Sequence, residues 1–224
     1  MVPALVTGCV GCSVGGCGAV PNGLAANGEF HYECVGPADR ECDDREPFTF
    51  GGQLPRAPLA RGARFRLVHA GAGGPVRAVS DDAVANVGGV MAARRSGDVG
   101  FFVEAGEEIE DALRLSVLEP DRIGIEPLGA RLGRLSVSAG GALPLRVVAF
   151  CGEMHLAGSV PATCSVDDPS VATVAEEQVG VCAVRGIRTG MVRVRAATGA
   201  LTAEVVVEVE GVADGGPLDA GADG

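Results

Sequence analysis

The chain has 224 residues, which is enough for one large domain or two small ones. Its formal net charge is −11, and a chain this acidic repels phosphate backbones and anionic lipid headgroups. Nucleic acid and direct electrostatic binding to a membrane surface are therefore disfavoured as partners. The sequence contains no apolar run long enough to cross a membrane as a helix.

The first residues are similar to a bacterial lipoprotein-processing site. Residues 5–9 read Leu-Val-Thr-Gly-Cys, with a small residue directly before the cysteine and aliphatic residues further back. This resemblance implies that Cys9 is lipidated, with Cys12 or Cys17 as alternatives. The charged and apolar parts of a full signal are missing ahead of it, so either the start is truncated or the match is accidental. Residues 1–28 then form this leader and a Gly-rich flexible tether.

Residues 29–47 form a small cysteine-containing segment. Cys34 and Cys42 flank Gly36-Pro37, which is a turn signal, so we expect a disulfide between these two cysteines. The run Phe30-His31-Tyr32 is a tight aromatic cluster outside the rest of the pattern. It is our candidate for ligand contact, and a partly exposed strand histidine is the alternative interpretation of His31.

Residues 48–120 and 121–211 contain short stretches in which apolar and polar residues alternate. In the first range the apolar positions are Phe65 and Leu67; Val99, Phe101 and Val103; Leu113, Leu115 and Val117. In the second range they are Leu143, Leu145 and Val147; Val192 and Val194; Val205, Val207 and Val209. Alternation with period two places one face of each strand in a core. Residues 212–224 are acidic and low in complexity, and we expect a solvated tail.

The two ranges also form an internal repeat. Ser80–Val87 aligns with Asp167–Val174, so that Val84 matches Val171, and Gly89-Val90 aligns with Gly180-Val181. Several short strands per range, with regularly spaced turn signals, are typical of a sandwich. The sequence thus predicts an all-β protein with two tandem immunoglobulin-like antiparallel sandwiches behind a Cys/Gly-rich N-terminal segment.

The repeat resembles the bacterial immunoglobulin-like domain of group 2. The resemblance is carried by the run 168–174, Asp-Pro-Ser-Val-Ala-Thr-Val, by Gly180-Val181 and by Gly190-x-Val192-x-Val194. Residues 121–211 match this pattern well, and 48–120 match it loosely. The resemblance implies a module of surface proteins, adhesins and envelope lipoproteins without catalytic residues.

Three cysteines fall in the second range, at 151, 164 and 182. A disulfide between Cys151 and Cys164 would close a hairpin, and we favour it over a Cys164–Cys182 pair that would link more distant strands. The remaining thiol would then be a buried free cysteine. A zinc site made of these three cysteines and His155 is a further alternative, because these ligand types suit zinc.

The sequence contains no phosphate-binding Gly loop and no His-Glu-x-x-His motif. His69 is interpreted as a hairpin-end histidine, and the acidic run 104–111 as a solvated turn. Asp81-Asp82 and Asp167-Asp168 occupy equivalent places and are expected to be turn residues. We therefore expect a non-catalytic lipoprotein of the cell envelope, either on the outer membrane or secreted, that binds or adheres to an unidentified protein or glycan. The alternatives are a purely structural spacer and, least favoured, an enzyme.

Overall fold

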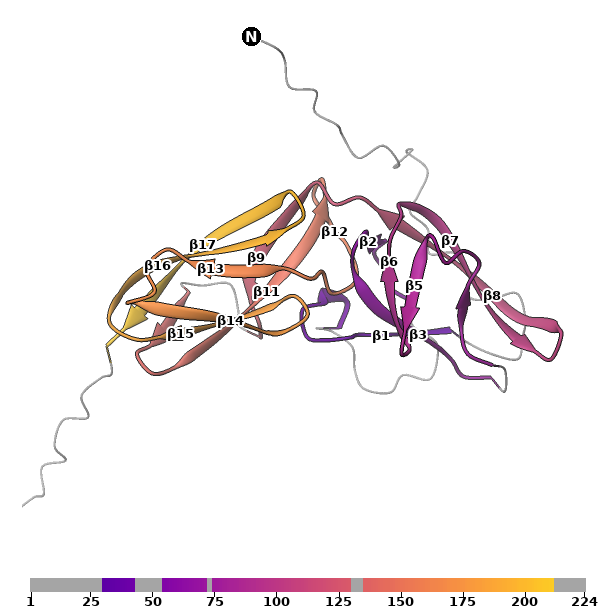
Figure 1. Ribbon diagram of the computed structural model, residues 1–224, viewed down its shortest axis with the longest axis horizontal. Helices are drawn as coiled ribbons and strands as arrows, with labels where there is room; N and C mark the ends of the chain where they lie inside the picture. Colours follow the sequence, from indigo (N-terminus) through magenta and orange to yellow (C-terminus); the bar gives the residue numbers. More distant parts are fainter. Residues whose placement is uncertain (1–29, 43–53, 72–73, 130–134, 212–224) are drawn as a thin grey trace, which may run out of the picture.

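The computed structural model describes residues 30–42, 54–71, 74–129 and 135–211. These residues contain seventeen strands and one short 3-10 helix, Arg40–Cys42, and no α-helix. Accordingly, no helix in the described ranges is long and apolar enough to cross a membrane. Figure 1 shows the strands gathered into two lobes side by side, with β1–β8 in one and β9–β17 in the other.

The first lobe is a sandwich of two four-stranded sheets. One sheet has the order β1 (Phe30–Glu33), β3 (Arg64–His69), β6 (Val90–Ala93), β5 (Val84–Val87). The other has the order β2 (Leu59–Ala60), β8 (Glu108–Leu118), β7 (Gly97–Ala105), β4 (Arg77–Ala78). All neighbours are antiparallel except β2 and β8, which are parallel.

The second lobe repeats this arrangement. One sheet contains β9 (Arg122–Pro127), β11 (Ala142–Cys151), β15 (Val181–Gly186) and β14 (Ala172–Gln178), with β12 (Met154–His155) paired to the end of β11. The other has the order β10 (Ser136–Ser138), β17 (Leu201–Glu210), β16 (Gly190–Thr198), β13 (Thr163–Val166). The single parallel pair, β10 with β17, corresponds to β2 with β8.

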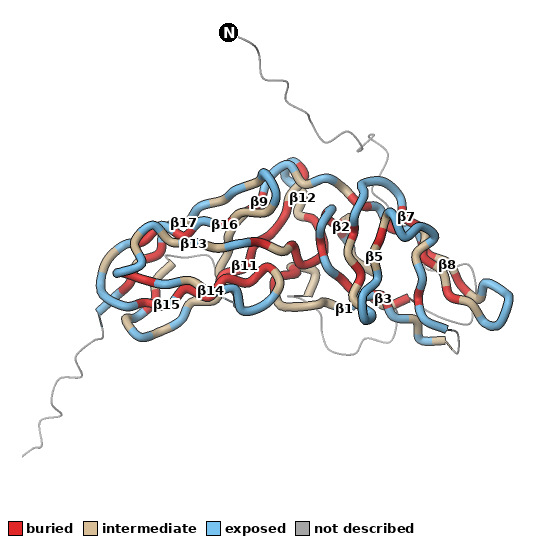
Figure 2. The backbone as a smooth tube through the Cα atoms, in the orientation of Figure 1, coloured by how far each residue is buried: buried red, intermediate tan, exposed pale blue. Residues whose placement is uncertain are grey.

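This strand order is that of an immunoglobulin-like sandwich, in which the chain crosses several times between two facing sheets. The predicted alternation produces it: Val99 and Phe101 in β7, and Val192 and Val194 in β16, are all buried. Each sandwich has its own apolar core, visible as the buried stretches in Figure 2. Full burial of such a side chain stabilises the fold by about 1.5–3 kcal/mol. The predicted all-β sandwich class is confirmed.

The structure matches the two sandwiches differently from the sequence repeat, by one residue, just before strands β5 and β14. The amide of Arg94 donates to the carbonyl of Ala83, and the amide of Ile187 donates to Val171 in the same way. Ala83, not Val84, is therefore the structural counterpart of Val171. Hydrophobic pattern alone misplaced this match because both Ala83 and Val84 are apolar.

The placement of strand β1 also differs from the sequence prediction. Residues 29–47 were expected to lie outside the sandwiches, but Phe30 pairs with His69 and Tyr32 with Leu67 in an edge of the first sheet. In the second sandwich, Ile125 pairs with Val147 at the equivalent place. A short strand far in sequence from its partner is hard to recognise, because its four residues carry little periodic signal.

Candidate functional site

The two sandwiches meet through main-chain hydrogen bonds. Residues 156–162, which we call the junction segment, leave the second sandwich and run along the first. The amide of Ala60 donates to Ala157 at 2.9 Å, and the amide of Ala157 donates to Pro58 at 2.8 Å. Arg64 and Ser159 exchange two such bonds, of 2.8 and 3.0 Å. The junction segment thus extends the sheet structure of the first sandwich.

A small apolar cluster lies beneath these hydrogen bonds. The first sandwich contributes Ala60 and Ala63, and the second contributes Ala149, Cys151, Leu156 and Val160. Leu118 and Met154 pack against it. Small side chains permit the close approach of the two backbones, and the buried contact excludes water from the hydrogen bonds.

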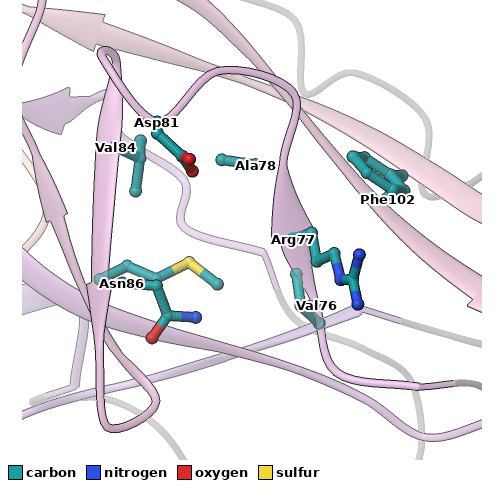
Figure 3. Close-up of a pocket in the computed structure, with 8 residues that line it drawn as sticks. Val76, Arg77, Ala78, Asp81, Val84, Asn86 and Phe102 are labelled. Atoms are coloured by element: carbon teal, nitrogen blue, oxygen red, sulfur yellow. The ribbon is translucent and has the colours of Figure 1, made fainter.

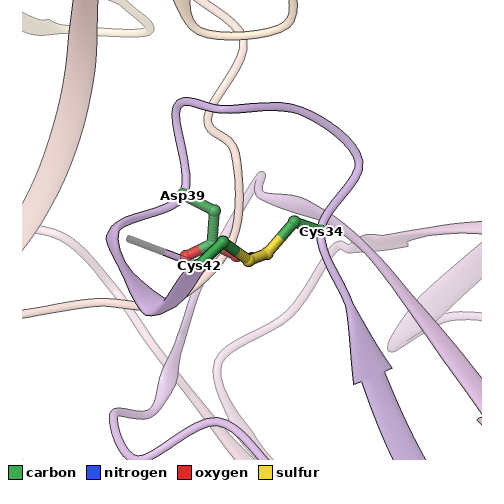
Figure 4. Close-up of side chains that lie close together, drawn as sticks. All are labelled: Cys34, Asp39 and Cys42. Atoms are coloured by element: carbon green, nitrogen blue, oxygen red, sulfur yellow. A yellow bond between two sulfur atoms is a disulfide. The ribbon is translucent and has the colours of Figure 1, made fainter. Parts of the chain in front are cut away.

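On the other side of the junction lies the loop 34–42, which we call the junction loop. It is closed by a disulfide between Cys34 and Cys42. Figure 4 shows the carboxylate of Asp39 directed toward this disulfide. Cys34, Asp39 and Cys42 bring their sulfur and oxygen atoms within 4.8 Å of one another. Since the two sulfurs are bonded to each other, this group is a structural staple and not a set of metal ligands.

Asp39 holds the junction loop against both sandwiches. The hydroxyl of Tyr32 donates to Oδ2 at 2.5 Å, and the amide of Glu41 donates to Oδ1 at 3.1 Å. A third donor is the amide of Gly158, from the junction segment. Asp39 is 1% exposed. Burial raises the pKa of its carboxyl, and the hydrogen bonds from Tyr32 and from the two amides oppose that rise.

A histidine–carboxylate contact and an ion pair connect the junction loop to the second sandwich. Glu41 Oε1 lies 3.1 Å from Nε2 of His155, and the Glu41 side chain is 5% exposed. Arg40 lies 3.6 Å from Glu126, which also binds Arg146 at 3.3 Å. His155, predicted as a possible zinc ligand, is therefore bound to a carboxylate of the other sandwich.

Each sandwich supplies the junction with a stretch that its counterpart lacks. Strands β1 and β2 are joined by residues 34–58, whereas residues 128–135 join the equivalent β9 and β10. Strand β11 runs on to Cys151 and is followed by β12 and the junction segment, whereas β3 ends at His69. The roles of Asp39, Glu41 and Gly158 were not predicted from the sequence. The signal that could have pointed to these residues is the unequal number of residues between equivalent strands of the two sandwiches.

The aromatic cluster proposed for ligand contact lies largely inside the protein. Phe30 is 0% and Tyr32 3% exposed, and both belong to the first core. Tyr32 stacks on Phe65, and Phe30 meets the ring of His69 edge to face. Alternation along β1 explains this placement, because residues 30 and 32 share the inward face. His31 is half-buried between them.

The cysteines of the second sandwich are paired differently from the favoured prediction. Cys164 on β13 is bonded to Cys182 on β15, so that the disulfide joins the two sheets. Cys182, the thiol expected to be free, is therefore paired, and Cys151 is buried and also disulfide-bonded. The hairpin argument failed because β11 and β13 belong to different sheets. With Cys164 and Cys182 bonded, the alternative zinc site loses two of its ligands.

His69 forms a buried pair with Asp111. Its Nε2 lies 3.3 Å from Oδ2 of Asp111, and both side chains are almost fully buried. Nδ1 accepts a hydrogen bond from the amide of Gly71, so Nε2 carries the proton that it shares with Asp111. This arrangement orients the ring within the sandwich and exposes no reacting atom to a substrate.

The turn predicted at Asp167-Asp168 is present. The carboxylate of Asp168 accepts hydrogen bonds from the amide and the hydroxyl of Ser170, at 2.9 and 2.5 Å. These bonds hold the pKa of Asp168 below its ordinary value. Cys9, Cys12, Cys17 and residues 212–224 lie outside the described residues.

No family model and no curated protein matches the chain. Several solved structures are similar to it. Domains 4 and 5 of the S-layer protein SbsC share 15% identity over 60% of this chain and 74% of theirs, with a TM-score of 0.30. SbsC domains 4–9 share 14% identity over 86% of this chain and 30% of theirs, with a TM-score of 0.35. The Escherichia coli adhesin FdeC shares 13% identity over 84% of this chain and 65% of its own, with a TM-score of 0.29.

The chain thus spans less than a third of the longer SbsC fragment. The assignment of an immunoglobulin-like fold depends on the strand order and register described above.

Proposed function

We propose that the chain is a non-catalytic envelope protein that presents two immunoglobulin-like sandwiches, as one stiff unit, for binding or adhesion. In this proposal the sandwiches belong to the bacterial group 2 class. Lipidation of Cys9 anchors the chain to the outer membrane, and the partner is a protein or a glycan.

The observation that carries the proposal is the junction. Main-chain hydrogen bonds, a buried apolar cluster, a disulfide-closed loop, an ion pair and a histidine–carboxylate contact all connect the sandwiches. Interfaces between domains of one chain are by default small and permit relative motion. A junction built from two dedicated insertions opposes bending, which suits a protein that holds a binding surface at a fixed distance and orientation.

The polar groups inside the protein support a structural role. Asp39, Glu41, His69 and Asp111 are buried, but each is held by hydrogen bonds or an ion pair within the fold. A catalytic pair needs access to a substrate, and these groups lie under packed strands. They act as fixed supports of the sandwiches and of their junction.

Detergent partition tests the anchoring part of this proposal. Cells producing the full chain are extracted with Triton X-114, and the same is done for a Cys9→Ser variant. We expect the original chain in the detergent phase and the variant in the aqueous phase, because an acyl chain adds about 0.8 kcal/mol of membrane affinity per buried methylene. Recovery of both in the aqueous phase would overturn lipid anchoring at Cys9.

The second candidate function is a spacer that holds other parts of an envelope assembly apart. The stiff junction favours this role equally. Alanine replacement of exposed loop residues distinguishes the two, since a spacer tolerates it and a binding protein loses its partner.

A further inference from the structure

The first sandwich is open along one side where the second is closed. Its side strands β4 and β5 belong to opposite sheets, and no other described strand pairs with their outer edges. In the second sandwich the equivalent strands are β13 and β14, which pack against each other. We call the gap between β4 and β5 the open edge.

The hydrogen-bond register shows which residues correspond across the two sandwiches. The amide of Val79 donates to Gly100 at 2.9 Å, as the amide of Asp167 donates to Arg193 at 3.2 Å. Val79 is therefore equivalent to Asp167. Three residues earlier in the sequence, Val76 is equivalent to Cys164. In the second sandwich that position is covered by the disulfide to Cys182.

In the first sandwich Val76 is itself buried in the core, and the difference from the second sandwich comes from hairpin length. The β14–β15 hairpin is the longer one, and Cys182 lies near its turn. The β5–β6 hairpin turns earlier, at Gly88 and Gly89, where both residues have positive φ. Strand β4 also has only two residues, compared with four in β13. The open edge is thus the space that a longer strand and hairpin fill in the other sandwich.

A pocket of about 280 Å³ lies at the open edge. Its apolar walls include Val76, Val84, Met91 and Phe102. Figure 3 shows Asp81 on one side of this pocket, beside Val84, and Arg77 on the other. A cavity of about 150 Å³ is enough to hold a benzene ring, so the pocket can accept an aliphatic side chain. Typical drug-sized ligands occupy about 300–1,000 Å³, which makes a single side chain the better fit.

Two exposed apolar residues directly follow pocket-lining residues in the chain. Val79 is 71% and Val87 77% exposed, the highest values among the large hydrophobic residues described. Each adjoins a residue that lines the pocket. Exposed apolar side chains on the segments that border a hollow favour an interaction site.

We propose that the open edge binds an extended peptide segment of a partner protein by strand addition. The peptide main chain pairs with the outer edge of β5 or β4, and an aliphatic side chain enters the pocket. Asp81 forms no ion pair among the described residues, whereas Arg77 is bound to Glu104 at 3.4 Å. Asp81 and the net charge of −11 therefore select a basic residue beside the aliphatic one.

A phage-displayed library of random eight-residue peptides tests this proposal on the full chain. We expect enrichment of sequences in which aliphatic residues alternate with polar ones and include arginine or lysine. The selected peptides are then synthesised with a fluorescent label, and their binding is followed by anisotropy. Failure to enrich such sequences would overturn the proposal.

Three variants locate the binding. Ala78→Leu fills the pocket, and Val79→Asp and Val87→Asp place charge on the exposed apolar residues beside it in the chain. We expect each to weaken peptide binding at least tenfold. Val206→Asp, at a residue 47% exposed on β17 of the second sandwich, is the matched control and should leave binding unchanged. Thermal unfolding of each variant verifies that it is folded, and Ala78→Leu should be no less stable than the original chain.

Equal binding by the original chain and the three variants would place the peptide elsewhere and overturn the proposal. Sedimentation that shows a dimer, abolished by Val79→Asp, would instead identify a second copy as the occupant and would also overturn it. The proposal adds a binding mode to the proposed function but does not depend on lipid anchoring, so failure of one test leaves the other informative.

Discussion

Asp39 is the residue on which the junction depends most. It lies under the loop that it supports, and its oxygens accept hydrogen bonds from both sandwiches. Removal of a buried acceptor leaves its donors without partners, which is more harmful than the loss of the bond itself.

We predict that Asp39→Ala lowers the free energy of unfolding by at least about 1–3 kcal/mol, because the hydroxyl of Tyr32 and two amides lose their acceptor. Urea denaturation measures this change. Asp81→Ala, at an exposed aspartate, is the control and should fall within about 0.5 kcal/mol of the original chain. Equal stabilities for Asp39→Ala and the control would show that the loop is not held by this carboxylate.

The pH dependence of stability provides a separate test of Asp39. Because burial raises the pKa of Asp39 above its ordinary 3.8, the folded chain binds this proton more tightly than the unfolded chain. Its stabilising contribution is then fully present below 3.8 and is lost as the pH rises through the raised pKa. We predict that the stability of the original chain relative to Asp39→Asn falls over that window. If the stability of the original chain relative to Asp39→Asn instead rose with pH, the pKa of Asp39 would not be raised on folding.

The disulfide between Cys164 and Cys182 closes a loop with a sequence separation of 18. We predict that replacing both cysteines with alanine lowers the stability of the second sandwich by about 2–4 kcal/mol, since the unfolded chain regains the freedom of that loop. Differential scanning calorimetry measures the loss. An unchanged unfolding temperature would argue against this pairing.

At the scale of elements, the sequence carried most of the information on strands and little on how they connect. Alternate apolar residues such as Val99 and Phe101, or Val192 and Val194, identified the central strands, because one buried face imposes a period of two. Strand β1 was missed, and the pairing of Cys164 with Cys182 was considered but not favoured. Both are set by sheet order, which brings together segments far apart in sequence.

The junction site was missed for the same reason. Asp39, Glu41 and His155 have no motif spacing, and they meet only after both sandwiches have formed. The turn at Asp168 was predictable, because an aspartate before Pro and Ser binds its own backbone locally.

The junction segment depends on a glycine. Gly158 has φ +94, and a Cβ there would lie 2.6 Å from Cβ of Ala63. We predict that Gly158→Ala lowers the free energy of unfolding by about 1–3 kcal/mol from backbone strain alone, and further through the clash. It should also speed hydrogen exchange at the amides of Arg64 and Ser159, which pair across the junction.

Gly199→Ala is the matched control for this change. Gly199 also has a positive φ, of 55, but a Cβ there would meet nothing within 4 Å. It should show the backbone strain without faster exchange at Arg64 and Ser159. Equal exchange at these two amides in both variants would indicate that the junction segment does not depend on close approach at Gly158.

At the scale of the whole molecule, the chain uses its two sandwiches differently. The second is closed by β13, β14 and a disulfide between its sheets. The first has the open edge, and its junction loop reaches back to the second. In our proposals the molecule is thus a stiff two-part unit with one side available for a partner.

Rigidity of the junction is the claim on which this description depends, and residual dipolar couplings measured by NMR test it most directly. We predict that the backbone couplings of both sandwiches, in the same weakly aligning medium, fit one alignment tensor with the orientation in Figure 1. Two tensors that differ in magnitude between the sandwiches would show independent motion and contradict a stiff unit.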